Sequence, residues 1–231
     1  MHMNIKRQNA LRIVFLTLLL LPISLFGQER VQLADRSILN VFLVKPDSFS
    51  IEASPLVILM AGGPGNASIS RDTSQWLGSG FAQRGWMVAV PISPDNRSFR
   101  GASNNEKIKQ LIEELQKRDN VAEGKVLLAG VSNGGMSALE IARRDPESYF
   151  GVAAVPALSG RNARNDSLAG FPVYLRIGGQ DQLDWADQFD STVESLASAG
   201  VELDAEILYG APHMFRMDWE TLGPWLERFN P

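Results

Sequence analysis

The sequence Val126-Leu127-Leu128-Ala129-Gly130-Val131-Ser132-Asn133-Gly134-Gly135 joins an apolar run to a glycine-rich turn. The run at 126–129 predicts a strand buried on both faces, and the residues after the turn predict a helix up to about residue 144. Residues 130–134 match the pattern G-x-S-x-G, in which glycine allows a sharp strand-to-helix turn. Such a turn lifts the hydroxyl of Ser132 clear of the sheet, where it is available as a nucleophile.

A second interpretation of the same turn is purely structural. Glycine-rich connections between a strand and a helix are common, and in such a connection Ser132 would act only as the helix cap. The setting favours a nucleophile, because the following helix points its N-terminus at the negative charge that develops during attack on a carbonyl. We therefore expect Ser132 to be catalytic, provided that the chain also supplies a base and an acid.

Outward from this turn, strand-like and helix-like segments alternate, which is typical of an α/β domain with a mostly parallel central sheet and helices on both faces. The strand at 201–207 alternates apolar and acidic residues, so we expect it at an edge of the sheet. The connection at 156–170 is too short for a sizeable lid domain. The other expected strands lie at 37–45, 56–60, 86–90, 126–129, 151–155 and 173–177, and further helices at 107–118, at 185–199 and at 218–229.

Length and composition restrict the class of protein. The 231 residues fit one domain with a sizeable core, since 45% are hydrophobic and 21% are charged. The absence of cysteine excludes disulfides, thiolate metal sites and cysteine nucleophiles, and two histidines leave little room for a metal cage. No phosphate-cradling or dinucleotide-binding glycine motif occurs. A net charge of −4 argues against nucleic acid as a partner.

The N-terminus has the pattern of a secretory signal peptide. Basic residues at 6, 7 and 12 precede an apolar run at 13–26, and the sequence turns polar after Gly27. That run holds about 14 residues, fewer than the roughly 20 that span a bilayer, so a cleaved signal is favoured over a membrane anchor. We expect a signal peptide at 1–27, a mature domain at 28–231 without a stable membrane span, and a secreted or periplasmic location.

Loss of residues 1–27 would change the charge and the histidine count. Three positive charges and no acidic residue leave, so −4 becomes −7, which disfavours polyanionic substrates and membrane surfaces. His2 leaves as well, and His213 is then the one remaining histidine. A serine hydroxyl needs a base within hydrogen-bond reach. His213 follows the last expected strand, in a loop where it can hang over the strand ends, and it is the expected base.

The base must itself be oriented by an acid. Asp181 directly follows the expected strand at 173–177, so it lies at the carboxyl end of the sheet, where catalytic groups of open α/β sheets gather. Asp184 is the second candidate, but aspartate before a helix commonly serves as its N-cap, and a helix is expected from Trp185. This division of roles favours Asp181 as the acid.

Backbone amides for an oxyanion are expected after the strand at 56–60. The glycine-rich loop Ala61-Gly62-Gly63-Pro64-Gly65-Asn66 lets bare amides approach a negative oxygen. Pro64 has no N–H to donate, so the amide of Gly63 is the preferred donor. Its expected partner is the amide of Asn133, the residue after the nucleophile.

The order of the Gly63 loop, the Ser132 turn, Asp181 and His213 resembles the α/β-hydrolase superfamily over the whole mature chain. The compact length is similar to that of small lidless serine esterases, among them the dienelactone hydrolase, phospholipase/carboxylesterase and secreted polyester or feruloyl esterase groups. The resemblance implies a catalytic triad of Ser132, His213 and Asp181 with an oxyanion hole at Gly63 and Asn133. The chain departs from the pattern of these esterases at two positions, namely Ala61, where many relatives have histidine, and Asn133 in the turn after the nucleophile.

These features predict an exported hydrolase that cleaves carboxylic esters through an acyl-enzyme, with no metal or organic cofactor. The expected substrate is a small-molecule ester or the end of an ester polymer. Two alternatives stay open, namely a serine peptidase of the prolyl-oligopeptidase type and a catalytically inactive binding module. Six side chains near the motifs are expected either to line an acyl or aryl pocket or to pack in the core: Asn66, Trp76, Met136, Trp185, Met214 and Phe215.

Overall fold

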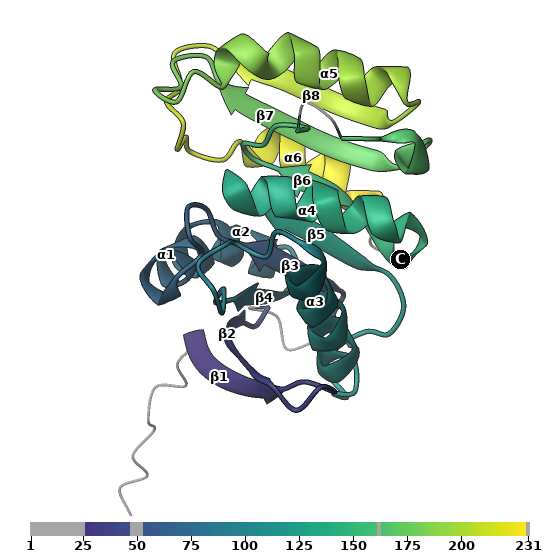
Figure 1. The fold of residues 1–231 in the computed structure, drawn as a ribbon. Coiled ribbons are helices and arrows are strands. Elements are labelled where there is room, and N and C mark those ends of the chain that lie inside the picture. The colour runs from purple at the N-terminus through teal and green to yellow at the C-terminus, as the bar shows by residue number, and fades with distance from the viewer. Residues whose placement is uncertain (1–25, 47–52, 161–162, 230–231) are drawn as a thin grey trace, which may run out of the picture.

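The computed structural model describes residues 26–46, 53–160 and 163–229. In this part of the chain eight strands form one sheet (Figure 1). The strands are β1 (Phe26–Gln32), β2 (Ile38–Val44), β3 (Leu56–Met60), β4 (Met87–Pro91), β5 (Val126–Gly130), β6 (Tyr149–Ala154), β7 (Pro172–Gly178) and β8 (Glu202–Leu208). Their spatial order is β1-β2-β4-β3-β5-β6-β7-β8.

The sheet is mostly parallel, as the alternation of strands and helices predicts. Strand β2 runs antiparallel to both β1 and β4, whereas the strands from β4 to β8 are parallel to one another. The loops that follow β3, β5, β7 and β8 therefore emerge at one end of the sheet. These are the loops that carry the candidate catalytic residues.

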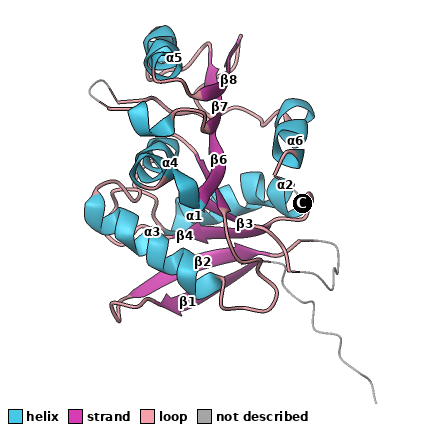
Figure 2. Ribbon diagram, turned by 90° about the vertical axis from the view of Figure 1, so that its right-hand side faces the viewer, coloured by secondary structure: helices cyan, strands magenta, loops and turns pink. Residues whose placement is uncertain are grey.

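Helices cover both faces of the sheet (Figure 2). The helical segments are α1 (Ala67–Thr73), the π-helical turn η1 (Ser74–Gly78), α2 (Ser79–Ala82), α3 (Ala102–Leu115), α4 (Asn133–Arg144), α5 (Phe189–Ser198) and α6 (Trp219–Glu227). Short 3-10 turns are η2 (Pro146–Ser148), η3 (Asp166–Leu168) and η4 (Ala186–Gln188). No segment among the described residues forms a separate lid.

Successive side chains of the buried strands point to opposite faces of the sheet, so the core has two layers. Ile58 of β3 belongs to the layer that packs against α3, α4 and α5, and its neighbour Leu59 belongs to the layer against η1, α2 and α6. Strands β3, β4 and β5 are buried at every position. A continuous apolar run is what a strand covered on both faces requires, which explains why the sequence marks these three strands so clearly.

The expected edge strand is confirmed, with a shift of one residue. In the described part of the chain strand β8 pairs only with β7, and its burial alternates along the strand, so one side faces water. The helix expected at 107–118 begins five residues earlier, at Ala102. The sequence does not mark this start, because the first turn of the helix is polar and lacks the apolar spacing of an amphipathic helix. The helix expected from Trp185 starts as the turn η4 and becomes regular only at Phe189.

The expected signal peptide falls largely outside the described residues, which begin at Phe26. Phe26 and Gly27 belong to β1, where they pair with Val44 and Leu43. The register continues through Gln32, so five of the seven pairs of β1 and β2 lie in the expected mature chain. Within the described residues, no helix combines the length and the apolar character that crossing a membrane requires.

Candidate active site

The turn between β5 and α4 holds Ser132 in a strained backbone conformation, with φ 55° and ψ −119°. The neighbouring glycines explain how the turn closes. A Cβ added to Gly134 would lie 2.0 Å from the carbonyl oxygen of Met60, and one added to Gly130 would lie 2.3 Å from the backbone of Gly134. The backbone amide of Ser132 donates to the carbonyl of Pro156 at 2.8 Å, which ties the turn to the loop that follows β6. The G-x-S-x-G pattern is therefore a packing requirement here.

This crowding gives a prediction for stability. Gly134→Ala is expected to lower the free energy of unfolding by about 3 kcal/mol or more, because the new methyl group meets backbone atoms that cannot rotate away. Gly160→Ala is the matched control, since no atom of the described residues lies within 4 Å of a Cβ at that position, and it is expected to change stability by less than about 0.5 kcal/mol. Urea denaturation followed by circular dichroism measures both. Equal midpoints for the two variants would contradict the packing argument.

Three side chains from three loops form one hydrogen-bonded line. The Oγ atom of Ser132 lies 2.9 Å from Nε2 of His213, and Nδ1 of His213 lies 2.6 Å from Oδ2 of Asp181. An ionised carboxylate can only accept, so Nδ1 of His213 donates to Asp181 and Nε2 is left to accept the proton of Ser132. This is the arrangement that a serine nucleophile with an oriented base requires.

The line is shielded from water. Ser132, His213 and Asp181 are 8%, 5% and 6% exposed. The second oxygen of Asp181 accepts from the amide of Leu183 at 2.7 Å, and the Trp185 ring packs edge-on against the imidazole at 4.9 Å between centroids. Asp181 and His213 are thus held by contacts other than the one they share, so the imidazole keeps its orientation toward Ser132.

Asp184 takes neither of the roles considered for it. The turn η4 begins at Ala186 and has no side-chain cap, so the expectation that Asp184 caps a helix at Trp185 is wrong. Asp184 instead is exposed, with φ 56°, in a left-handed position of the loop, and its amide donates to the carbonyl of Asp181 at 3.1 Å. Aspartate tolerates this conformation better than most residues.

The loop after β3 lies directly beside the nucleophile. A Cβ added to Gly62 would be 3.4 Å from Cβ of Ser132, which shows how close the two segments are. The side-chain amide of Asn133 donates to the carbonyl of Gly63 at 3.0 Å, so it joins the two residues expected to supply oxyanion donors. Asn133 is also the first residue of α4, whose first amides have no acceptor within the helix. Its backbone N–H therefore has no acceptor within α4.

A buried serine braces the same loop in a way that the sequence does not indicate. Ser98 donates its hydroxyl to the carbonyl of Ala61 at 2.6 Å and accepts, at its own carbonyl, the hydroxyl of Ser137 in α4. The methyl side chain of Ala61 cannot form a hydrogen bond that holds the loop, and Ser98 supplies one from the segment between β4 and α3. The sequence does not indicate a role for Gln182 either, yet its side-chain oxygen accepts from the backbone amide of His213 at 3.2 Å. Neither residue lies in a recognisable motif.

The six expected pocket residues take different positions. Trp185 contacts the imidazole of His213, and Met136 lines hollows beside α4. Met214 is half exposed, next to His213. The side chain of Asn66 caps α1 by accepting from the amide of Ile69. Phe215 is buried in the core, and Trp76 packs against the same layer. For these last two residues the core alternative describes what is observed, since Phe215 is a buried member of that apolar layer and Trp76 is partly buried against it.

Within the described residues no group of three or more histidine, cysteine, aspartate or glutamate side chains is placed to hold a metal ion. The line from Asp181 to Ser132 contains the chemical groups that nucleophilic catalysis on a carbonyl needs, with a proton acceptor and its orienting acid.

Sequence comparison with family models matches residues 97–223, more than half of the chain, to the dienelactone hydrolase family. The chain belongs to this family. The matched range includes Ser132, Asp181 and His213, and it excludes the loop at Gly63. No curated protein matches the sequence significantly.

Solved structures share the fold of this dienelactone hydrolase family member. Thermogutta terrifontis esterase 2, in a structure phosphoramylated by tabun, is 14% identical, with a TM-score of 0.66 over 90% of this chain and 96% of the esterase. A thermostable esterase is also 14% identical (TM-score 0.61), and the comparison covers 81% of this chain but 55% of that esterase. Porphyromonas gingivalis dipeptidyl peptidase 4 is 14% identical (TM-score 0.62), and 88% of this chain covers 34% of the peptidase. At these identities the likeness shows the fold alone.

Proposed function

We propose that this protein is a serine hydrolase that cleaves carboxylic esters. The observation that carries the proposal is the hydrogen-bonded line of Asp181, His213 and Ser132, which ends on a hydroxyl at the N-terminus of α4. Family membership supports a hydrolase, and esterases are among the proteins with the same fold. Ester cleavage needs no more than this line and two amide donors.

The reaction follows from the positions of the atoms. Oγ of Ser132 attacks the ester carbonyl carbon while its proton passes to Nε2 of His213, and the carbonyl oxygen becomes negative beside the amides of Gly63 and Asn133. The bond to the alcohol oxygen then breaks, and Nε2 of His213 returns the proton to that oxygen. Water repeats the two steps on the acyl-enzyme and releases the acid, which restores Ser132. Asp181 stays ionised throughout and stabilises the imidazolium.

Export belongs to the same proposal. The basic residues and the short apolar run before Gly27 support a signal peptide, and cleavage there leaves most of the β1–β2 ladder in place. The product would be a secreted or periplasmic esterase of residues 28–231.

A direct test compares an ester with an amide on purified protein. We expect hydrolysis of p-nitrophenyl butyrate and labelling by a fluorophosphonate probe, with hydrolysis of alanyl- and prolyl-p-nitroanilides at least about 10³-fold slower, since no observation in the described residues favours a peptide substrate. Faster cleavage of the anilides would replace the esterase with a peptidase. Absence of both hydrolysis and labelling would support the inactive binding module instead.

A further inference from the structure

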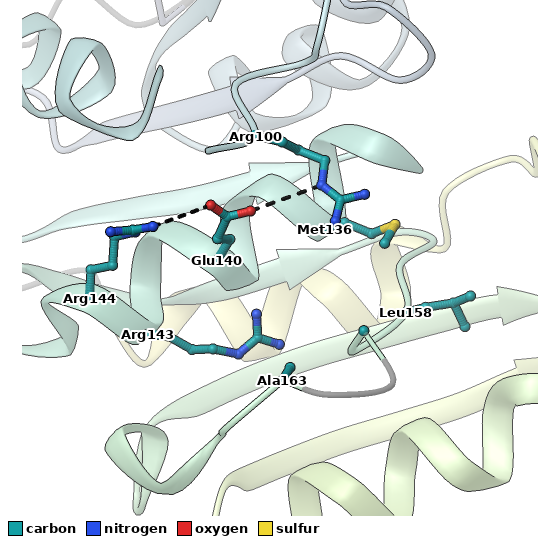
Figure 3. Close-up of a pocket in the computed structure, with 8 residues that line it drawn as sticks. Arg100, Met136, Glu140, Arg143, Arg144, Leu158 and Ala163 are labelled. Carbon is teal, nitrogen blue, oxygen red and sulfur yellow. Dashed lines mark ion pairs between the residues drawn. The ribbon is translucent and has the colours of Figure 1, made fainter. Parts of the chain in front are cut away.

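A charged groove runs along the outer side of α4. Two adjoining hollows, about 470 Å³ and 430 Å³, share Arg100 and Glu140 in their linings. The first hollow reaches Asn133, next to the nucleophile, and the second reaches Arg143 and Arg144 near the end of the helix. We call these two hollows together the α4 groove. Figure 3 shows Arg100 and Arg144 turned toward Glu140 from opposite sides, with Arg143 on the far side of the hollow near Ala163.

Spacing along the helix gives the groove its length. Positions 133, 136, 140 and 143 follow one another at intervals of three or four, and 144 is four residues after 140, so all five share one side of α4. With a rise of about 1.5 Å per residue, Glu140 lies roughly 10 Å and Arg143 roughly 15 Å beyond Asn133. The groove thus offers positive charge well away from the reacting carbonyl.

The local charge is opposite to that of the whole chain. Four arginines, Arg97, Arg100, Arg143 and Arg144, line the groove against the single carboxylate of Glu140, whereas the chain as a whole carries −4. Positive charge concentrated in a hollow attracts anions more strongly than the net charge indicates. The negative net charge of the chain therefore does not describe the charge of the α4 groove.

Glu140 shows that the groove accommodates a carboxylate. Its oxygens lie 3.9 Å from Nε of Arg100 and 3.6 Å from Nη2 of Arg144, and one of them accepts the amide of Gly101 at 2.9 Å. The two arginine side chains are 48% and 52% exposed. Ion pairs this long and this exposed are weak, so both guanidinium groups keep donors for a second anion.

Arg143 adds a partly buried positive charge. Its Nε donates to the side-chain oxygen of Asn165 at 2.7 Å and its Nη2 to the hydroxyl of Ser159 at 3.1 Å, and both partners are neutral. Burial lowers the pKa of Arg143 from its usual range, Glu140 opposes this effect, and the nearby charge of Arg100 adds to it. In the described part of the chain no carboxylate lies within ion-pair distance of Arg143, so an incoming anion would compensate a charge that the fold leaves unpaired.

The groove lies on the acyl side of the scissile bond. His213 must reach the leaving oxygen, and it approaches Ser132 from the loop after β8. The hollow that reaches Asn133 is lined by Arg97 and Arg100, which follow β4 on the opposite side of β5 in the sheet, whereas Leu158 and Ala163 of the farther hollow follow β6. The alcohol part of a bound ester therefore points toward His213, and the acyl part points toward the α4 groove.

We propose that the α4 groove binds a carboxylate at the far end of the acyl chain, roughly 10–15 Å from the scissile carbonyl, and so selects long-chain half-esters of dicarboxylic acids. The proposal rests on the proposed esterase function and names its substrate class. The acyl chain would pass Met136, and its carboxylate would lie among Arg100, Arg143 and Arg144.

The test uses matched substrates that differ only in charge. The p-nitrophenyl half-esters of adipic, suberic and sebacic acids are compared with the same esters capped as methyl esters. For the wild-type protein we expect kcat/KM for the sebacic half-ester to exceed that of its capped form by about tenfold at low salt, with a smaller ratio for adipic acid and a ratio that falls in roughly 0.3 M sodium chloride.

Variants assign the effect to the groove. Arg100→Gln combined with Arg144→Gln is expected to reduce the preference severalfold, with Arg143 left in place, and to leave the capped esters unaffected. Arg30→Gln combined with Arg36→Gln, two exposed residues on and next to the distant strand β1, is the charge-matched control. Glu140→Gln is expected to raise the preference severalfold, a gain that general damage to the fold would not produce.

Three results are distinguishable. Equal rates for charged and capped esters, or a preference that is unchanged in the double variant, would overturn the proposed substrate class while ester hydrolysis itself stands. Failure to hydrolyse any of the esters would remove the proposed function.

Discussion

Replacement of Ser132 by alanine is expected to lower kcat/KM for p-nitrophenyl butyrate by about 10⁴-fold or more. Oγ of Ser132 is the only nucleophile that His213 contacts in the described structure, at 2.9 Å, and without it the base has no proton to accept. The strained backbone at φ 55° is the same for serine and alanine, since both carry a Cβ. The variant should therefore fold with unchanged stability and lose activity only.

The matched control is Ser68→Ala. Ser68 is an exposed serine of α1, and the variant should keep the wild-type rate. Thermal unfolding of both variants shows whether the fold is retained, and loss of fluorophosphonate labelling in Ser132→Ala alone assigns the reaction to this hydroxyl. A Ser132→Ala protein that hydrolyses the ester at the wild-type rate would show that the line of three side chains is not the esterase site.

The central strands were predictable because a strand that is buried on both faces requires a continuous run of apolar residues, which is easily recognised in a sequence. The runs at β3 and β5 are apolar throughout and end in glycine-rich turns, so the sequence predicts both the strand and the loop that follows. Those loops hold Gly63 and Ser132. The structure thus brings together residues from separate motifs mainly because parallel strands end at one edge of the sheet.

Elements at the periphery have less distinctive sequence patterns. Strand β1 includes the polar sequence Gln28-Glu29-Arg30 and, among the described strands, pairs only with β2, so no continuous apolar run marks it. The helical segments at 67–82 are short and pass through the π-helical turn η1, which disturbs the spacing of a regular helix. Tertiary packing of Leu77 and Phe81, more than local preference, determines these segments.

Contacts made by loops were not predictable at all. The brace from Ser98 to Ala61 spans 37 residues of sequence, and the side chain of Asn133 reaches Gly63 across 70. From the sequence alone, the favourable interaction of positive charges with the C-terminal end of a helix dipole is a sufficient reason for Arg143 and Arg144 at the end of α4. Their place in the α4 groove depends on Arg100, which a different connection brings to the same hollow.

The acid of the triad provides the sharpest comparison that the chain offers, because two aspartates lie three residues apart in one loop. Asp181→Asn is expected to lower kcat by about 10⁴-fold, since a neutral amide can donate to Nδ1 of His213 and would stabilise the tautomer whose Nε2 carries a proton and cannot accept one from Ser132. Asp184→Asn is expected to keep the wild-type kcat. Asparagine accepts the left-handed conformation at φ 56° as readily as aspartate, and the Asp184 side chain is exposed.

Steady-state kinetics with p-nitrophenyl butyrate and thermal unfolding of the two variants separate a loss of orientation from a loss of fold. Each substitution removes one negative charge from the same loop, so a general electrostatic effect on the imidazole would lower both rates to a similar extent. The two carboxyl groups differ in contact. Oδ2 of Asp181 is 2.6 Å from the imidazole, and Asp181 is buried. A large loss in Asp181→Asn alone would therefore assign the role to that contact, whereas equal losses would mean that charge in this loop, and not the hydrogen bond, supports the base.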